Sequence, residues 1–248
     1  MEESIRIIEE RPIVAKGPVV IEGLPDVGLV GTIAASFLVE QLSLEEVASV
    51  ESDLLPPVMV IHEGVLSNPL RIFGNDRMLV VTSQIALPPP TLYPLSRVLA
   101  DWFVSKKARL TVSLTGFPVE DRANIESPSV FGVAGNKEGG DVLGKAGIEP
   151  MAEGFVAGLY ALLLKECSRR SLPSIALISQ SFLNYPDPGA AAAVVTAVDK
   201  ILNLKIDVKP LLEKGDEIRI KARDLMRQAQ GTIGQVKQVE QEMPLIYK

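Results

Sequence analysis

Short apolar runs alternate with helical segments along most of this chain, and this alternation is the strongest constraint on its fold. Continuous apolar runs without strict polar alternation lie at residues 19–21, 58–62, 70–73, 78–83, 110–114 and 174–178. Helical spacing of apolar residues is expected at residues 32–42, 91–106, 151–164 and 188–202, and again from Val208 onward. Continuous apolar strands are buried on both faces, and the helices between them form crossover connections. The sequence therefore predicts an α/β protein with a three-layer, mostly parallel sheet.

Turn residues in the first half of the chain indicate that the sheet is mixed. Gly64 and the sequence Gly74-Asn75-Asp76 separate three short apolar runs, which predicts a hairpin and thus antiparallel strands. No period of 20 to 50 residues is visible, which argues against solenoids and propellers. Residues 116–150 are rich in Gly, Pro and Asn, and we expect a long loop there. Loops of that length usually bind a ligand or cover an interface.

Composition indicates one large domain with an appended helix. The chain has 248 residues, of which 47% are hydrophobic and 23% are charged, so it can bury a sizeable core. We expect an α/β core domain at residues 1–210, a helical segment at 211–243 and a flexible tail at 244–248. The formal net charge is -6 and the isoelectric point is about 5.0. Nucleic acid and anionic membranes require a cationic face, so neither is expected as the main partner.

Cysteine usage and the first residues bear on the compartment. Cys167 is the single cysteine, and Met1 is followed by Glu2 and Glu3 in place of a basic, apolar leader. Both features favour a cytoplasmic protein. The most apolar expected helix, residues 151–164, contains Glu153 and is too short to span a bilayer. We therefore expect a core helix and no membrane insertion.

Residues 23–31 form the strongest candidate for a nucleotide site. Gly23, Gly28 and Gly31 follow an apolar strand and open a helix, where backbone amides can hold a phosphate. The segment lacks the Lys-Ser/Thr pair of a P-loop, its glycine spacing is not Gly-x-Gly-x-x-Gly, and no acidic residue follows in the place of a ribose clamp. Glycine also allows a tight turn and close packing. We favour the packing role and keep a nucleotide-binding enzyme that uses residues 23–31 as the alternative.

The remaining reactive residues have simpler structural explanations. His62 is the only histidine and has no second His or Cys at metal-ligand spacing. Cys167 lies on an expected helix with basic neighbours and is more typical of a half-buried thiol than of a nucleophile. Asp187 precedes Pro188, and this pair predicts a helix N-cap at Asp187 with proline at the first helical position. We predict no catalytic residue, no metal ion and no cofactor.

A weak heptad pattern runs through the C-terminal segment, from about Asp216 to Met243. Its two seam positions are occupied by Ile218, Leu225, Thr232 and Val239, and by Ala222, Ala229, Val236 and Met243. Glutamines and charged residues fill the other faces, which predicts a solvated helix. This helix either docks on its own domain or projects from it, and a projecting helix would carry the tail roughly 40 Å at 1.5 Å per residue.

The last residues have the chemistry of a docking plug. Pro244 disfavours helix at Met243 and releases an extended tail of Leu245, Ile246, Tyr247 and Lys248. The apolar side chain can fill a pocket, the Tyr247 ring adds rigid area with a hydroxyl group, and the terminal carboxylate can pair with a cation. This ending resembles the hydrophobic-Tyr-X tail with which proteasome activators enter pockets between α-subunits of the proteasome core particle, where the carboxylate meets a lysine and the gate opens.

The body of the chain resembles the proteasome assembly chaperone family of archaea and bacteria. Three stretches carry the resemblance over about residues 5–220: GLPDVGLVG at 23–31, PPVMVIHEG at 56–64 and YPDPGAA at 185–191. The resemblance implies a phosphorylase/hydrolase-like α/β fold, a homo-oligomeric habit and no established catalytic residues. With this tail it implies an archaeal, ATP-independent chaperone or activator that docks into the proteasome α-ring through Leu245, Ile246, Tyr247 and Lys248.

Several alternatives stay open at this point. A structural oligomer whose Tyr247 packs between its own subunits would have the same ending. The sequence does not choose between an assembly chaperone and a gate-opening activator, and it gives neither the ring size nor the participation of a sibling subunit. Several tails on one ring would act at high effective concentration, so weak single tails could still bind tightly.

Overall fold

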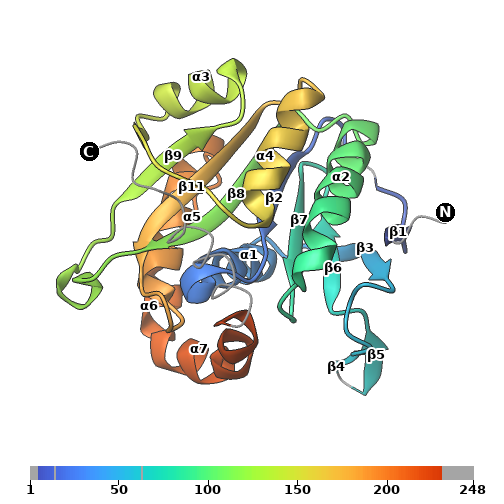
Figure 1. Ribbon diagram of the computed structural model, residues 1–248, viewed down its shortest axis with the longest axis horizontal. Coiled ribbons are helices and arrows are strands. Elements are labelled where there is room, and N and C mark those ends of the chain that lie inside the picture. Colours follow the sequence, from blue (N-terminus) through green and yellow to red (C-terminus); the bar gives the residue numbers. More distant parts are fainter. Residues whose placement is uncertain (1–4, 14, 63, 231–248) are drawn as a thin grey trace.

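A mixed sheet forms the centre of the computed structural model, which describes residues 5–13, 15–62 and 64–230 (Figure 1). Within these residues the sheet has nine strands in the order β1-β3-β6-β7-β2-β8-β11-β9-β10. Their bounds are β1 Ile5–Glu9, β2 Val19–Gly23, β3 Glu45–Ser52, β6 Leu70–Gly74, β7 Met78–Ser83, β8 Leu110–Pro118, β9 Val130–Ala134, β10 Glu149–Pro150 and β11 Ser174–Ser181. The central strands β7, β2, β8 and β11 are parallel, and β1, β3 and β6 extend one edge in antiparallel pairs.

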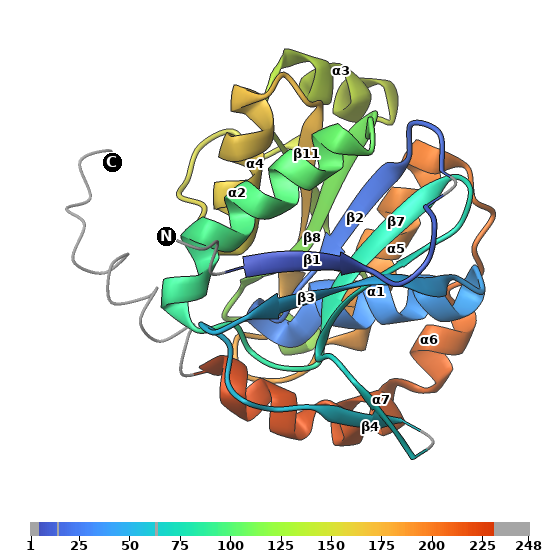
Figure 2. The ribbon, with the colours of Figure 1, turned by 90° about the vertical axis from the view of Figure 1, so that its right-hand side faces the viewer.

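Helices cover both faces of this sheet, as the alternation of strands and helices predicted. Their bounds are α1 Val30–Gln41, α2 Pro89–Ser105, α3 Lys137–Lys145, α4 Leu159–Arg169, α5 Pro188–Leu202, α6 Lys209–Glu213 and α7 Gly215–Lys221. Figure 2 shows α2 and α4 on one side of the sheet and α1 and α5 on the other. The three-layer α/β architecture and the mixed sheet are therefore confirmed.

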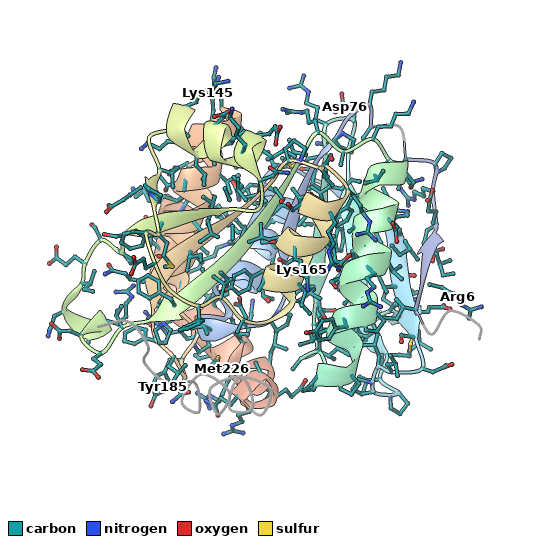
Figure 3. The ribbon with its side chains drawn as sticks, turned by 45° about the horizontal axis from the view of Figure 1, so that its top comes forward. Arg6, Asp76, Lys145, Lys165, Tyr185 and Met226 are labelled. Carbon is teal, nitrogen blue, oxygen red and sulfur yellow. The ribbon has the colours of Figure 1, made fainter. Side chains whose placement is uncertain are left out.

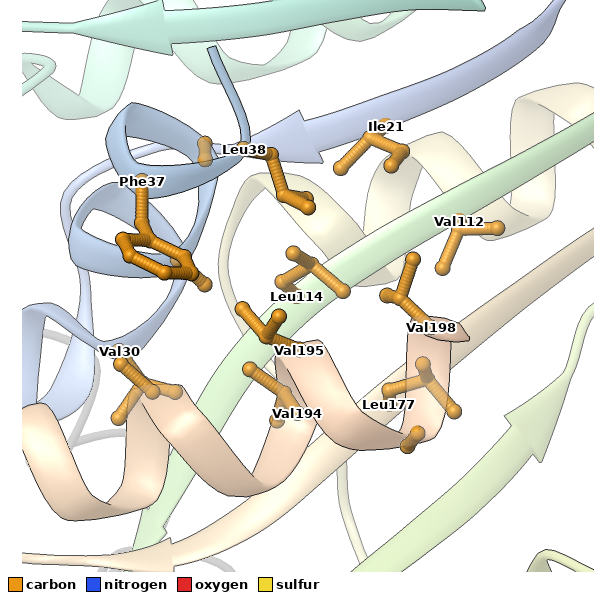
Figure 4. Close-up of a cluster of buried hydrophobic side chains, with 14 of the residues drawn as sticks. Ile21, Val30, Phe37, Leu38, Val112, Leu114, Leu177, Val194, Val195 and Val198 are labelled. Atoms are coloured by element: carbon orange, nitrogen blue, oxygen red, sulfur yellow. The ribbon is translucent and has the colours of Figure 1, made fainter. Parts of the chain in front are cut away.

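Successive side chains along each strand point to opposite faces of the sheet, and this divides the core into two clusters. On β2, Val19 and Ile21 face α1 and α5, whereas Val20 faces α2 and α4. Figure 4 shows the first cluster, in which Phe37 of α1 and Val195 of α5 meet side chains of β2, β8 and β11. Burial of each large apolar side chain contributes about 1.5–3 kcal/mol, so these two layers hold the helices on the sheet.

Residues 116–150 are not a long loop, so that prediction was wrong. They contain the end of β8, then β9, α3 and β10. The glycines of α3 suggested a loop, but α3 is a helix and Gly139 serves close packing. A Cβ atom at Gly139 would overlap the carbonyl oxygen of Ser174 on β11, and Asn136 caps the helix by accepting a hydrogen bond from Gly139 N at 3.0 Å.

Two expected elements differ in their bounds or place. The helix expected at 151–164 begins only at Leu159 and ends at Arg169, because Gly154 and Gly158 have φ angles of 150° and 104° that no helix accepts. The strand expected at 58–62 is β4 Val60–His62, which pairs with β5 Val65–Ser67 outside the main sheet. Strands β1 and β3 were missed, since charged residues interrupt or flank their apolar residues: Arg6 and Glu9 in β1, and Glu45, Glu46 and Glu51 in β3.

The C-terminal segment packs on the body as far as the structure describes it. Helical residues continue after α7 to position 230, with a turn at Ala222. Met226 and Ala229 are buried against the cluster of α1 and α5, and Gln230 Nε2 donates to the carbonyl oxygen of Asn184 at 3.2 Å. Figure 3 shows Met226 and Tyr185 at the same end of the molecule. The seam residues after Ala229 lie outside the described residues.

Candidate functional site

A cavity of about 290 Å³ lies at the carboxyl ends of the central parallel strands. The ends of β2 and β8 form its floor, and the first residues of α2 and α4 with the segment before α4 form its walls. Ligands of open α/β sheets usually bind at this edge. The volume is near the lower limit for a small-molecule site.

Two carboxyl groups line the cavity, and each has one oxygen without a partner. Glu22 is 3% exposed, and its Oε1 accepts a hydrogen bond from Leu24 N at 3.1 Å. Asp26 Oδ2 accepts a hydrogen bond from the Thr115 hydroxyl. The second oxygens, Glu22 Oε2 and Asp26 Oδ1, are buried and form no hydrogen bond with any described residue. A buried polar atom left in this state is costly unless a ligand or water satisfies it.

Burial raises the pKa of both groups. The pKa of Glu22 rises from 4.5 to about 7, chiefly through loss of solvation. The Ser113 hydroxyl, opposite Glu22 in register on β8, lies close enough to lower this pKa somewhat without meeting hydrogen-bond geometry. Burial also raises the pKa of Asp26 well above its ordinary value, and the nearby Glu22 carboxyl raises it further.

The lining of the cavity suits a cation better than an anion. Among the residues around it there is no Lys, Arg or His, whereas Phe117, Phe155 and Tyr160 supply aromatic rings. A phosphate group would meet Glu22 and Asp26 without any compensating positive side chain. The alternative of a nucleotide-binding enzyme at residues 23–31 therefore gains no support from the groups at this edge of the sheet.

The glycines of residues 23–31 bring α1 close to the sheet. A Cβ atom at Gly31 would overlap the carbonyl oxygen of Leu114 on β8. Gly28 has a φ angle of 63°, and a Cβ atom there would overlap the Ser181 hydroxyl. Leu29 follows with a φ angle of 50° although it is fully buried, so the turn into α1 is strained. The packing role expected for the glycines is confirmed at these positions.

A buried ion pair joins the segment after β8 to the residue before α5, and that residue also contacts the turn into α1. Arg122 Nε and Nη2 donate to the two carboxylate oxygens of Asp187 at 2.7 and 2.9 Å, and both side chains are buried. Asp187 Oδ1 also accepts from Ala190 N at 3.0 Å, so the predicted N-cap is confirmed. The Asp187 amide donates to the Gly28 carbonyl at 2.8 Å. Residues 23–31 and 185–191, far apart in the sequence, therefore form one structural unit.

A second surface feature is the arm formed by β4 and β5, together with residues 58 and 59. Its apolar side chains are exposed: Val58, Met59, Ile61, Val65 and Leu66. Ile61 and Leu66 face each other in the register of the two strands and are 72% and 65% exposed. Figure 1 shows this arm projecting below β3 and β6. Exposed apolar side chains gathered in this way mark interaction surfaces.

A family model covers most of this architecture. It matches residues 20–226, from β2 to the buried Met226, and it describes the PAC2 family. The chain belongs to the PAC2 family. The match includes the cavity, the turn into α1, the arm and the Arg122–Asp187 pair.

Solved structures with the PAC2 fold include two proteins of Pyrococcus furiosus. PbaA, an archaeal homolog of proteasome-assembly chaperone, is 31% identical, with a TM-score of 0.86 over 92% of this chain and 99% of PbaA. PbaB, an archaeal proteasome activator, is 25% identical, with a TM-score of 0.74 over 90% of this chain and 99% of PbaB. An uncharacterized protein of Methanocaldococcus jannaschii is 28% identical over 92% of this chain and 93% of its own length.

The other residues considered from the sequence are not brought together by the PAC2 fold. His62 is exposed at the tip of the arm, and Cys167 is fully buried on α4. Burial raises the pKa of Cys167 to about 11, which disfavours the thiolate that a nucleophile needs. In the part of the chain that the structure describes, no three His, Cys, Asp or Glu side chains form a metal-binding group. No helix there has the length and apolar character needed to cross a bilayer.

Leu245, Ile246, Tyr247 and Lys248, the residues proposed to dock, lie outside the described residues. Glu22, Asp26 and Arg122 were missed from the sequence. Their signals were a glutamate inside the apolar strand VVIEG and the run LTVSLT on β8, in which Thr and Ser alternate with apolar residues. The structure buries both faces of β8, so these hydroxyl groups face the α2 and α4 layer beside the cavity.

Proposed function

We propose that this chain is an ATP-independent proteasome-binding protein, related in function to assembly chaperones and activators, and not an enzyme. The observation that carries this proposal is its 31% identity to PbaA over 92% of this chain and 99% of PbaA, together with the likeness to PbaB. One is described as a homolog of proteasome-assembly chaperone and the other as a proteasome activator. Both attributes concern the proteasome, so the core particle is the proposed partner.

Leu245, Ile246, Tyr247 and Lys248 are the proposed contact residues. Lys248 must then end the chain, because the plug requires a free carboxylate next to Tyr247. In the proposed complex the tail enters a pocket of the α-ring, where the apolar side chain and the Tyr247 ring are buried and the carboxylate pairs with a cation. The helical residues before position 230 pack on the body, which supports a tail carried by the domain surface.

The proposal includes a homo-oligomer that contacts its neighbours through the β4–β5 arm. A two-stranded hairpin is marginally stable alone, and this arm exposes Ile61, Val65 and Leu66. A second copy of the chain could cover these side chains. Oligomerisation would also present several tails to one α-ring, and linked binding of this kind can exceed the affinity of one tail by about 100- to 10,000-fold.

The tail is tested by deleting residues 245–248 and measuring both capture of a cognate proteasome core particle and its peptide hydrolysis. The proposal predicts loss of capture and of any stimulation. A variant with Lys248→Ala keeps a terminal carboxylate after Tyr247 and serves as the matched control, which should bind like the wild type. Equal capture by the deleted and full-length proteins would refute tail docking.

The arm is tested by sedimentation of an Ile61→Asp, Leu66→Asp variant. We expect a shift from the oligomer to the monomer without unfolding, because both side chains are already exposed. A monomeric variant should also bind the core particle more weakly than the wild type. An unchanged sedimentation profile would exclude the arm as the subunit contact.

A further inference from the structure

We propose that the cavity at the carboxyl ends of β2 and β8 is a binding site for a small organic cation. An ammonium, amidinium or guanidinium group would lie between Glu22 and Asp26, and its apolar body would contact Phe117 and Phe155. The ligand is a free small molecule, and the site is independent of proteasome binding.

The two unpartnered oxygens define the head-group position. Glu22 Oε2 and Asp26 Oδ1 are buried at the cavity, and the other oxygen of each carboxyl group is already held, by Leu24 N and by the Thr115 hydroxyl. These two contacts orient both side chains and leave one oxygen of each for a donor. An amidinium or guanidinium group supplies several N–H donors in one plane and can satisfy both oxygens together.

The other residues of the lining indicate what charge the ligand carries and what kind of apolar group is attached to its head group. The residues around the cavity include no Lys, Arg or His, so the protein supplies no counter-charge for Glu22 and Asp26 there. A cationic ligand would supply it. The rings of Phe117, Phe155 and Tyr160 attract cations through their faces and favour an aromatic or aliphatic body.

The segment before α4 forms the accessible wall of the site. Phe155 lies on it and is 68% exposed, although it also lines the cavity. Gly154 and Gly158 flank this residue with φ angles of 150° and 104°. Because Phe155 is both exposed and part of the lining, its substitution tests the site without disturbing the core.

Binding should release protons. Glu22 and Asp26 bind a cation when they are ionised, and their pKa values are raised by burial in the free protein. Tyr160 is the other titratable group in the lining, and Cys167, farther along α4, is buried beside Thr111. Affinity should therefore increase as the pH rises toward about 7, by up to about tenfold per pH unit for each proton released, and the contribution of Glu22 should level off above that pH.

The site is tested with benzamidine by isothermal titration calorimetry of the full chain at pH 6, 7 and 8. Benzamide and benzoate have nearly the same shape but are neutral and anionic. We expect saturable benzamidine binding that strengthens with pH, and much weaker or no binding of the other two. Equal binding of benzamide, or no saturable binding of benzamidine at pH 8, would overturn the proposal.

Three variants complete the test at pH 8. Glu22→Gln removes one charge and should weaken benzamidine binding at least about tenfold, as expected for a charge-assisted contact. Phe155→Ala removes one ring face and should weaken it about two- to fivefold. Glu126→Gln removes an exposed acid outside the lining and should change nothing. Benzamidine binding that is the same in Glu22→Gln and Phe155→Ala as in the wild type would place the ligand elsewhere and refute the site.

Discussion

Replacing Glu22 by Gln should change the pH dependence of folding stability in a defined direction. The Glu22 carboxyl is buried, and its pKa rises from 4.5 to about 7 in the folded chain. The folded state therefore holds this proton more tightly than the unfolded state does. The group contributes its full stability below pH 4.5, and this contribution is lost as the pH rises through about 7.

The size of the effect follows from the same pKa. A tenfold change in proton affinity corresponds to about 1.4 kcal/mol, so ionising the buried Glu22 costs about 3 kcal/mol of stability above pH 7. The Gln variant cannot ionise, and its side-chain oxygen can still accept from Leu24 N. Relative to the wild type, Glu22→Gln should gain up to about 3 kcal/mol between pH 5 and pH 8.

Urea unfolding at half-unit pH steps from 5 to 8.5 measures this difference. Urea is preferred to guanidinium chloride, because guanidinium is itself a candidate ligand of the cavity. Subtracting the wild-type curve removes the contributions of groups that the substitution leaves unchanged. Glu126→Gln, at an exposed position, provides the control and should give a flat difference. A flat difference for Glu22→Gln as well would refute the account of a buried, protonated carboxyl group.

Two further perturbations test the packing around the cavity. Gly31→Ala should destabilise the fold by about 1–3 kcal/mol or more in urea unfolding, because its Cβ atom would overlap the Leu114 carbonyl. Gly144→Ala is the control, because an added Cβ atom there would have no atom within 4 Å, and it should be neutral or stabilising by up to about 1 kcal/mol. Arg122→Ala should cost about 3–5 kcal/mol, because Asp187 would remain buried without its partner. Arg219→Ala breaks an exposed pair and should cost less than about 1 kcal/mol.

The layered fold could be predicted because its signals are local and periodic. Apolar runs such as residues 19–21 and 174–178 became central strands, and Asp187 with Pro188 began a helix as expected. Glycine caused the errors at residues 116–150 and 151–164, since its meaning depends on what packs against it. In α3, Gly139 allows a helix to approach Ser174, whereas Gly158 ends any helix before α4. A sequence pattern does not separate these two uses.

The cavity could not be predicted from the sequence, for a different reason. Glu22 and Asp26 stand out only because the fold buries Glu22 and the Oδ1 atom of Asp26 without a cationic side chain in the lining, and burial is a property of the whole chain. The Arg122–Asp187 pair likewise joins residues 65 positions apart. The tail, in contrast, could be proposed from the sequence alone. Its proposed chemistry depends only on Tyr247, its apolar neighbour and a free carboxylate.

The central claim is that this PAC2 protein binds the proteasome core particle through Tyr247 and the carboxylate beside it. Surface plasmon resonance with immobilised core particle measures this directly for the wild type, Tyr247→Ala and a variant with one glycine added after Lys248. The account predicts clear binding of the wild type and loss of binding in both variants. Undiminished binding of Tyr247→Ala, or no binding of the wild type to a cognate core particle, would contradict it.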